Sequence, residues 1–153
     1  MKTIIIEMVM ASMACMFFAI VYNTPKKELL FCWIFGGIGY GIYYYLMEFR
    51  GLGTFSNFFG AFAIAVLSRF TSVKRQIPVM VYVLPSVFPL SPGGNMYNAC
   101  YAFITCDLNT SMFETMKCIK IVGMCVIAII IVLSLPDFMF GTKKTTINKT
   151  DTV

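Results

Sequence analysis

The chain contains several long apolar runs with almost no charged residues. Residues 29–47, 51–68 and 76–106 lack Asp, Glu, Lys and Arg altogether, and residues 3–22 carry one charge, at Glu7. An α-helix needs about 20 such residues to cross a hydrocarbon core of ~30 Å. Because 59% of the residues are hydrophobic and 12% are charged, the sequence predicts an all-α integral membrane protein that lies in the lipid bilayer.

A fifth apolar run, residues 121–136, contains 16 residues and reaches spanning length if its helix begins within residues 113–120. Lys117 and Lys120 would then extend their charged ends toward the membrane surface. Together the five runs predict a bundle of about five transmembrane helices.

This transmembrane domain is expected to cover residues 1–136. Residues 137–153 are polar, rich in Thr and Lys, and are predicted to form a disordered cytoplasmic tail. The first helix is expected to be a retained span. A cleaved signal peptide is the alternative, but Glu7 interrupts the apolar region that such a peptide requires.

Charged residues between the runs predict the orientation of the chain, because cytoplasmic loops are enriched in Lys and Arg. With the amino terminus outside, the outer side holds Lys2 and Arg50. The cytoplasm then holds eight bases: Lys26, Lys27, Arg69, Lys74, Arg75, Lys143, Lys144 and Lys149. We therefore expect a plasma-membrane protein with its carboxyl terminus in the cytoplasm. The net charge of +5 is explained by this topology and does not indicate nucleic-acid binding.

The 31-residue uncharged run, residues 76–106, is too long for one span and too short for two. As a single helix it would extend roughly 46 Å at 1.5 Å per residue. Three prolines and two glycines in residues 85–94 disfavour a continuous helix. The fourth span is therefore predicted to be two half-helices, which either pass through the membrane or turn back within it. The lysines of the tail favour passage.

A broken helix at membrane depth is a candidate binding site, because unpaired backbone survives there only beside protein or a polar cavity. Asn95 is expected to cap the second half-helix, whose amino-terminal end suits a carboxylate. The alternative is a simple loop between two short helices. Asn57 is expected either to line the same cavity or to cap its own helix. The predicted substrate-binding residues are Ser91, Pro92, Gly93, Gly94, Asn95, Tyr97, Asn98 and Asn57.

Two carboxylates are candidates for proton coupling. Glu7 lies more than one turn inside the first helix, and Glu48 ends the second span beside Arg50. A carboxyl group in a cavity of low dielectric has a raised pKa and can carry a proton. The alternative is that both side chains extend to the outer interface.

Small residues four positions apart indicate close helix packing. Gly37 and Gly41 form such a pair in the second span, and Ala61 and Ala65 form one in the third. Small residues let membrane helices approach closely. This packing is expected within the chain, with a surface for a partner as the alternative.

The chain contains no histidine, which excludes a histidine-based catalytic triad and a histidine metal site. Its six cysteines show no paired spacing and are interpreted as small buried apolar residues. No phosphate loop or dinucleotide motif is present. We therefore expect no cofactor, no metal and no enzymatic activity.

Three segments, in this order along the chain, resemble the threonine/serine exporter family. They are Asn-Thr-Pro-Lys-Lys-Glu-Leu at 23–29, Gly-Gly-Ile-Gly-Tyr at 36–40 and Pro-Leu-Ser-Pro-Gly-Gly at 89–94. The likeness is strongest to the small membrane subunit of the family and covers roughly residues 1–135. Asn95 departs from the family pattern, which has a glycine or a small apolar residue at that position.

The resemblance implies a secondary exporter that moves small hydroxy amino acids (threonine, serine) or dicarboxylates such as succinate out of the cell. Taken with Glu7 and Glu48, it leads us to expect a proton-coupled exporter. Full-length family members join a soluble domain and two membrane halves, and this chain resembles the last half. It is therefore expected to act with a second, larger exporter subunit. The alternative function is a non-transporting assembly subunit whose glycine faces hold a partner in place.

Overall fold

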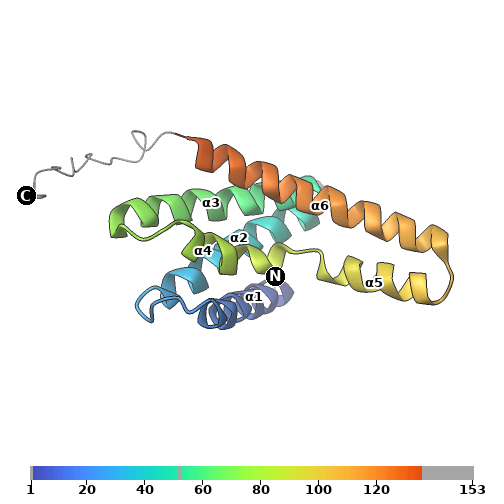
Figure 1. Cartoon of the computed structure of the whole chain (residues 1–153), viewed down its shortest axis with the longest axis horizontal. Helices are drawn as coiled ribbons and strands as arrows, with labels where there is room; N and C mark the ends of the chain where they lie inside the picture. Colours follow the sequence, from blue (N-terminus) through green and yellow to red (C-terminus); the bar gives the residue numbers. More distant parts are fainter. Residues whose placement is uncertain (1, 52, 136–153) are drawn as a thin grey trace, which may run out of the picture.

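The computed structural model describes residues 2–51 and 53–135, and every regular element in these ranges is helical. The predicted tail lies outside the described residues. The elements are α1 (Lys2–Val21), α2 (Leu29–Arg50), α3 (Phe55–Arg75), α4 (Met80–Val87), the 3-10 helix η1 (Phe88–Leu90), α5 (Gly93–Ile104) and α6 (Leu108–Ser134), as Figure 1 shows. The predicted all-helical class is therefore confirmed for these residues.

Three of these helices, α2, α3 and α6, are long and apolar enough to cross a membrane. Two shorter apolar stretches, Ile5–Val21 in α1 and Met80–Leu90 in α4 and η1, fall below that length. The described residues thus contain three clear candidate spans and two shorter apolar stretches, and the count of five spans stays a prediction.

Glycines on α2 allow it to pack closely against α1. A side chain at Gly37 would overlap Ser12, and a Cβ atom at Gly41 would lie 3.0 Å from the sulfur of Met8. Because apolar burial does not drive association in lipid, such close contact is what holds membrane helices together. Both glycines of the predicted pair therefore lie against α1 of the same chain.

The contact between α2 and α3 is equally close. Gly39 and Gly60 face each other, and a Cβ atom at Gly60 would lie 3.0 Å from the carbonyl oxygen of Gly39. Ile64 packs directly over Gly39. Ala61 and Ala65 are fully buried on the same helix.

The other side of α3 packs along the second half of α6. One apolar core joins these helices to η1 and consists of Ala61, Ile64, Leu90, Cys125 and Ala128. Near the end of α6, the Arg69 guanidinium donates to the carbonyl oxygens of Leu133 and Leu135, at 3.2 and 2.9 Å. A cation at this position also complements the negative end of the helix dipole.

The predicted interruption of the fourth span is narrower than residues 85–94. Pro85 lies inside α4, helical structure continues through η1 to Leu90, and Ser91 and Pro92 alone separate it from α5. Residues 85–90 and 93–94 are therefore helical, although their prolines and glycines were expected to disfavour a helix. The bond that Pro85 cannot make leaves the Val81 carbonyl without its usual N–H partner.

Thiol groups of neighbouring helices contact the carbonyl groups of α4. The Cys32 sulfur on α2 lies 3.7 Å from the Val81 oxygen, and the Cys15 sulfur on α1 lies 3.8 Å from the Ser86 oxygen. Such contacts from neighbours allow proline inside a membrane helix. These cysteines are buried as predicted, whereas Cys100 and Cys106 are exposed, contrary to the sequence interpretation.

Beyond the interruption, α5 folds back on the first half of α6 and forms a hairpin that projects from the bundle (Figure 1). Within the described residues, α5 packs against α6 alone. Asp107 caps α6 by accepting hydrogen bonds from the hydroxyl (2.7 Å) and the N–H (3.3 Å) of Thr110. These bonds lower the pKa of Asp107, so their stabilising effect is present above the ordinary carboxyl range and is lost as the pH falls.

Candidate functional site

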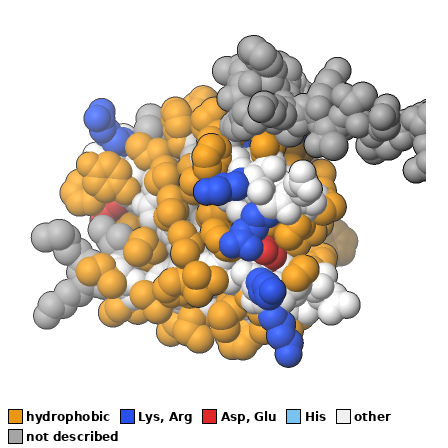
Figure 2. Space-filling view, turned by 90° about the vertical axis from the view of Figure 1, so that its left-hand side faces the viewer, with side chains coloured by type: hydrophobic (Ala, Val, Ile, Leu, Met, Phe, Trp, Pro, Cys, Tyr) orange, Lys and Arg blue, Asp and Glu red, His pale blue; other side chains and the backbone are white. Residues whose placement is uncertain are grey.

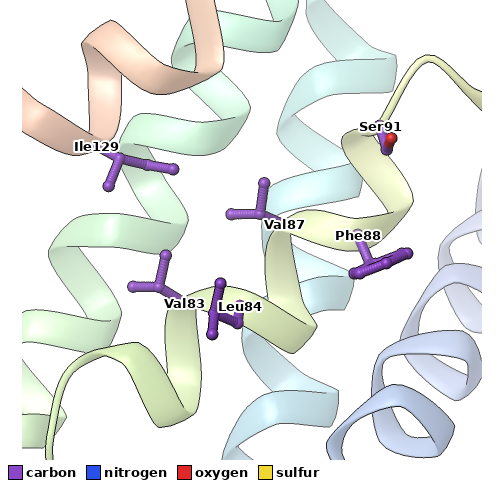
Figure 3. A pocket seen from close by; sticks show the side chains of 6 residues that line it. All are labelled: Val83, Leu84, Val87, Phe88, Ser91 and Ile129. Atoms are coloured by element: carbon purple, nitrogen blue, oxygen red, sulfur yellow. The ribbon is translucent and has the colours of Figure 1, made fainter. Parts of the chain in front are cut away.

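Ser91 and Pro92 interrupt the helical backbone between η1 and α5, and we call the segment before them, α4 with η1, the interrupted helix. It borders a cavity of about 240 Å³. Figure 3 shows side chains of α4 across from Ile129 of α6, with Ser91 at the point where the helix is interrupted. The lining residues are Val83, Leu84, Val87, Phe88, Ser91 and Ile129. Ser91 supplies the one polar side chain of this lining, so the cavity is largely apolar with a single hydroxyl at its edge.

The other residues predicted to bind substrate are divided between the core and the surface. Pro92 and Asn57 are buried. The exposed positions are Gly93, Gly94, Tyr97 and Asn98, with Asn95 partly exposed. A Cβ atom at Gly93 or Gly94 would meet no atom within 4 Å. Ser91 is therefore the one predicted residue that lines the cavity, and the start of α5 faces away from the rest of the chain.

Two capping roles predicted from the sequence are wrong. The residue before α5 is Pro92, no side chain caps that helix, and Asn95 lies in its first turn. Asn57 lies inside the first turn of α3, which follows Thr54. Both helices begin earlier than expected, because Gly93 and Phe55 already adopt helical backbone.

The two carboxylates predicted for proton coupling have different surroundings. Glu7 is partly buried and accepts a hydrogen bond of 2.9 Å from the hydroxyl of Tyr40, which joins α1 to α2. The rings of Tyr43 and Tyr44 lie beside that of Tyr40, with centroids 5.6 and 6.4 Å away. Glu48 is exposed near the end of α2.

Sequence reasoning missed the most buried carboxylate of the described chain, Glu28, whose residue is 3% exposed. One of its oxygens lies 2.8 Å from the Arg75 guanidinium, and the other accepts a 2.7 Å hydrogen bond from the Tyr82 hydroxyl. Glu28 thereby joins the start of α2, the end of α3 and the interrupted helix α4. Glu28 follows Lys26 and Lys27 in the sequence. Because this pattern is typical of a solvated loop, the burial of Glu28 was not predicted.

The sequence did contain one signal for this ion pair. Glu28 and Arg75 both adjoin the ends of predicted spans on the same side of the membrane. An acid and a base that share one end of a helical bundle can meet when their helices pack together.

The apolar helical bundle, with three helices long and apolar enough to cross a membrane, is that of a helical membrane protein. The sequence profile of the family described as Threonine/Serine exporter, ThrE, matches residues 7–135. The chain belongs to this family, and the resemblance drawn from its motifs is confirmed.

Among curated proteins, an uncharacterized protein of Haemophilus influenzae is 24% identical over 148 residues. The match covers 94% of this chain and 50% of that protein, so the chain spans about half the length of this relative. No solved structure matches the chain.

Proposed function

We propose that this chain is one subunit of a proton-coupled secondary exporter in the plasma membrane. Its substrates are small hydroxy amino acids, threonine and serine, or dicarboxylates such as succinate. The amino terminus lies outside the cell and the carboxyl terminus in the cytoplasm. The observation that carries the proposal is the family match over residues 7–135, because it covers both the bundle and the interrupted helix.

The substrate site is proposed to lie at the interruption between η1 and α5. Ser91 provides a hydroxyl at the edge of the apolar cavity. In the first turn of α5, the Gly93 and Met96 N–H groups donate to the carbonyl oxygens of Ser91 and Pro92, so the N–H groups of Gly94 and Asn95 are the ones proposed to meet the substrate. Asn95, Tyr97 and Asn98 add polar side chains on the outer side of that helix. Since this side faces away from the bundle, a second protein would be needed to enclose it.

That second protein is proposed to be the larger exporter subunit. The chain spans about half the length of its curated relative, so the other half of that relative is a candidate counterpart for part of the proposed subunit. The hairpin of α5 and α6 offers a large apolar surface that the rest of the described chain does not cover. Its exposed residues include Met96, Tyr97, Tyr101, Phe103, Met112 and Phe113. The exposed amide of Asn98 among them is costly in lipid and favours a protein neighbour.

The second candidate function is a non-transporting assembly subunit. It is favoured by the nearly apolar lining of the cavity beside the interruption, which offers one hydroxyl to a polar substrate. The projecting hairpin would then serve to hold the partner.

Efflux of threonine, serine and succinate tests the proposal. Cells with and without this gene, both carrying the larger subunit, are loaded with each compound, and its appearance outside is measured. Equal efflux of all three compounds from both kinds of cell would reject the exporter proposal.

Substitution at the interruption separates the two candidate functions. Because a side chain at Gly93 meets open space within this chain, Gly93→Val should leave folding and co-purification with the larger subunit intact. If the first turn of α5 contacts substrate, efflux should fall at least tenfold. Gly123→Val, at a second open glycine on α6, is the matched control and should retain efflux. Unchanged efflux for Gly93→Val would support the assembly subunit.

Proton coupling is tested at the two predicted carboxylates. Glu7→Gln retains an oxygen that can accept the Tyr40 hydrogen bond but cannot exchange a proton, so the pH dependence of efflux should flatten. Glu48→Gln should have the same effect if that residue takes part. Glu114→Gln is the control, since this carboxylate is paired with Lys117 on the projecting hairpin. A wild-type pH profile in both test variants would refute their role in coupling.

A further inference from the structure

A second cavity lies between the start of α2 and the end of α3, at the end of the bundle that faces the viewer in Figure 2. It has a volume of about 460 Å³ and is lined by Phe31, Phe70, Thr71, Lys74 and Arg75. Figure 2 shows Lys and Arg side chains gathered on this end of the molecule around an acidic group, with hydrophobic side chains on both sides. The site proposed above does not include any of these residues.

Two cations, Lys74 and Arg75, line this cavity, and they differ in their present partners. Arg75 lies 4.5 Å above the ring of Phe31 and uses one nitrogen for its 2.8 Å contact with Glu28. A guanidinium has five N–H donors, and the Arg75 side chain is 40% exposed, so donors remain for a ligand. Lys74 is exposed and forms no ion pair with any described residue.

We propose that this cavity binds a carboxylate group of the exported substrate on the cytoplasmic side. The inference rests on the proposed function and orientation and adds an entry site to them. Arg75 suits a carboxylate because its planar donors match the two oxygens. Lys74 adds a second positive charge, and the Thr71 hydroxyl can donate a hydrogen bond. The walls of Phe31 and Phe70 lower the local dielectric and strengthen these contacts.

The same arrangement links a bound carboxylate to the interrupted helix. Glu28, the present partner of Arg75, also accepts the hydrogen bond of Tyr82 on α4. A substrate carboxylate at the remaining donors of Arg75 would share the positive charge of the guanidinium with Glu28 and so weaken the connection between α3 and α4. Since α4 lines the first cavity, occupancy of the entry site would loosen the helix that borders the proposed transport site.

Uptake of radiolabelled succinate, threonine and serine into inside-out vesicles measures the KM on the cytoplasmic side. The vesicles carry this chain with the larger subunit. Lys74→Gln and Thr71→Val should each raise the KM, the lysine variant at least tenfold, with Vmax changed less than twofold. Lys26→Gln is the matched control, because it removes the same charge from an exposed position near the start of α2 without lining the cavity. An unchanged KM in both test variants would overturn the inference and leave the exporter proposal standing.

Binding to the purified full chain provides a readout that does not depend on transport. Succinate should raise the melting temperature of the wild type and of Lys26→Gln, but not that of Lys74→Gln. If wild-type vesicles transport nothing and this difference persists, the cavity is a carboxylate site and the exporter proposal fails. Absence of any difference would overturn the site.

An anionic lipid headgroup is the competing ligand of similar charge. Nanodiscs of phosphatidylcholine, with and without phosphatidylglycerol, distinguish the two ligands. One result would show that the cavity binds lipid and that the inference is wrong. Lys74→Gln would remove the stabilisation by phosphatidylglycerol, while the KM and the rise in melting temperature with succinate stay at wild-type values.

Discussion

Replacing Glu28 with alanine should destabilise the folded chain by about 2–3 kcal/mol. The substitution leaves the Tyr82 hydroxyl without its acceptor at a fully buried position, and it leaves the Arg75 guanidinium without its anion. Loss of one partner from a fully buried pair costs about 3–5 kcal/mol. We expect the smaller loss of about 2–3 kcal/mol for Glu28→Ala because the Arg75 side chain is 40% exposed and its guanidinium can bind water once the carboxylate is gone.

Equilibrium unfolding in detergent, followed by circular dichroism, measures this loss. Glu114→Ala is the matched control, because this carboxylate is 13% exposed, against 4% for Glu28, and pairs with Lys117 three residues away on the same helix instead of joining different helices. Its expected cost is below about 1 kcal/mol. The double variant Glu28→Leu with Arg75→Met should recover part of the stability, since it removes both charges together. Equal losses for Glu28→Ala and Glu114→Ala would show that the buried Glu28–Arg75 pair contributes no more to the free energy of unfolding than the pair on α6.

Replacing Gly39 with leucine should destabilise the chain by about 3 kcal/mol or more, which is the upper end of the cost of overpacking. The new side chain would overlap Ile64, and its Cβ atom would lie 3.4 Å from the carbonyl oxygen of Gly60. The Ile64 side chain is fully buried, so it can make room only by displacing its own neighbours between the helices. The variant should be recovered in low yield and should unfold at a lower denaturant concentration than the wild type.

Gly123→Leu on α6 is the control for this prediction. It introduces the same side chain into an apolar helix at a glycine with no atom within 4 Å of the new Cβ. Leucine also favours helix over glycine by up to about 1 kcal/mol, so the control should retain or slightly exceed wild-type stability. Similar losses in the two variants would mean that the contact between Gly39 and Gly60 does not hold α2 against α3.

Apolar runs in the sequence were sufficient to predict an all-helical membrane protein, because spans in lipid must satisfy their backbone hydrogen bonds within the helix. The length of the apolar run did not predict where α4 ends. Pro85 was expected to end the helix, but it lies inside α4. Pro85 remains helical because its neighbours supply thiol contacts and close packing, and neither can be read from the local sequence. The predicted cap at Asn95 failed for a related reason, since Gly93 begins the helix earlier.

Of the residues predicted to bind substrate, Ser91 alone lines the cavity beside α4. The other predicted residues near the interruption are polar or glycine, and most of them lie on the exposed side of α5. Glu28 escaped because its burial depends on contacts 47 and 54 residues away along the chain, with Arg75 and Tyr82. Tertiary contacts of this kind leave no pattern in a single sequence beyond the shared membrane side of their partners.

The thiol contacts with α4 have a practical consequence for labelling studies. Experiments that place single reporter cysteines in a membrane protein start from a version without native cysteines. In this chain Cys15 and Cys32 contact carbonyl groups of the helix that contains Pro85, so alanine at these positions would remove donors along with the sulfur. Serine retains an O–H donor of similar size. A reporter background with serine at both positions is therefore the one that leaves the interrupted helix in its native surroundings.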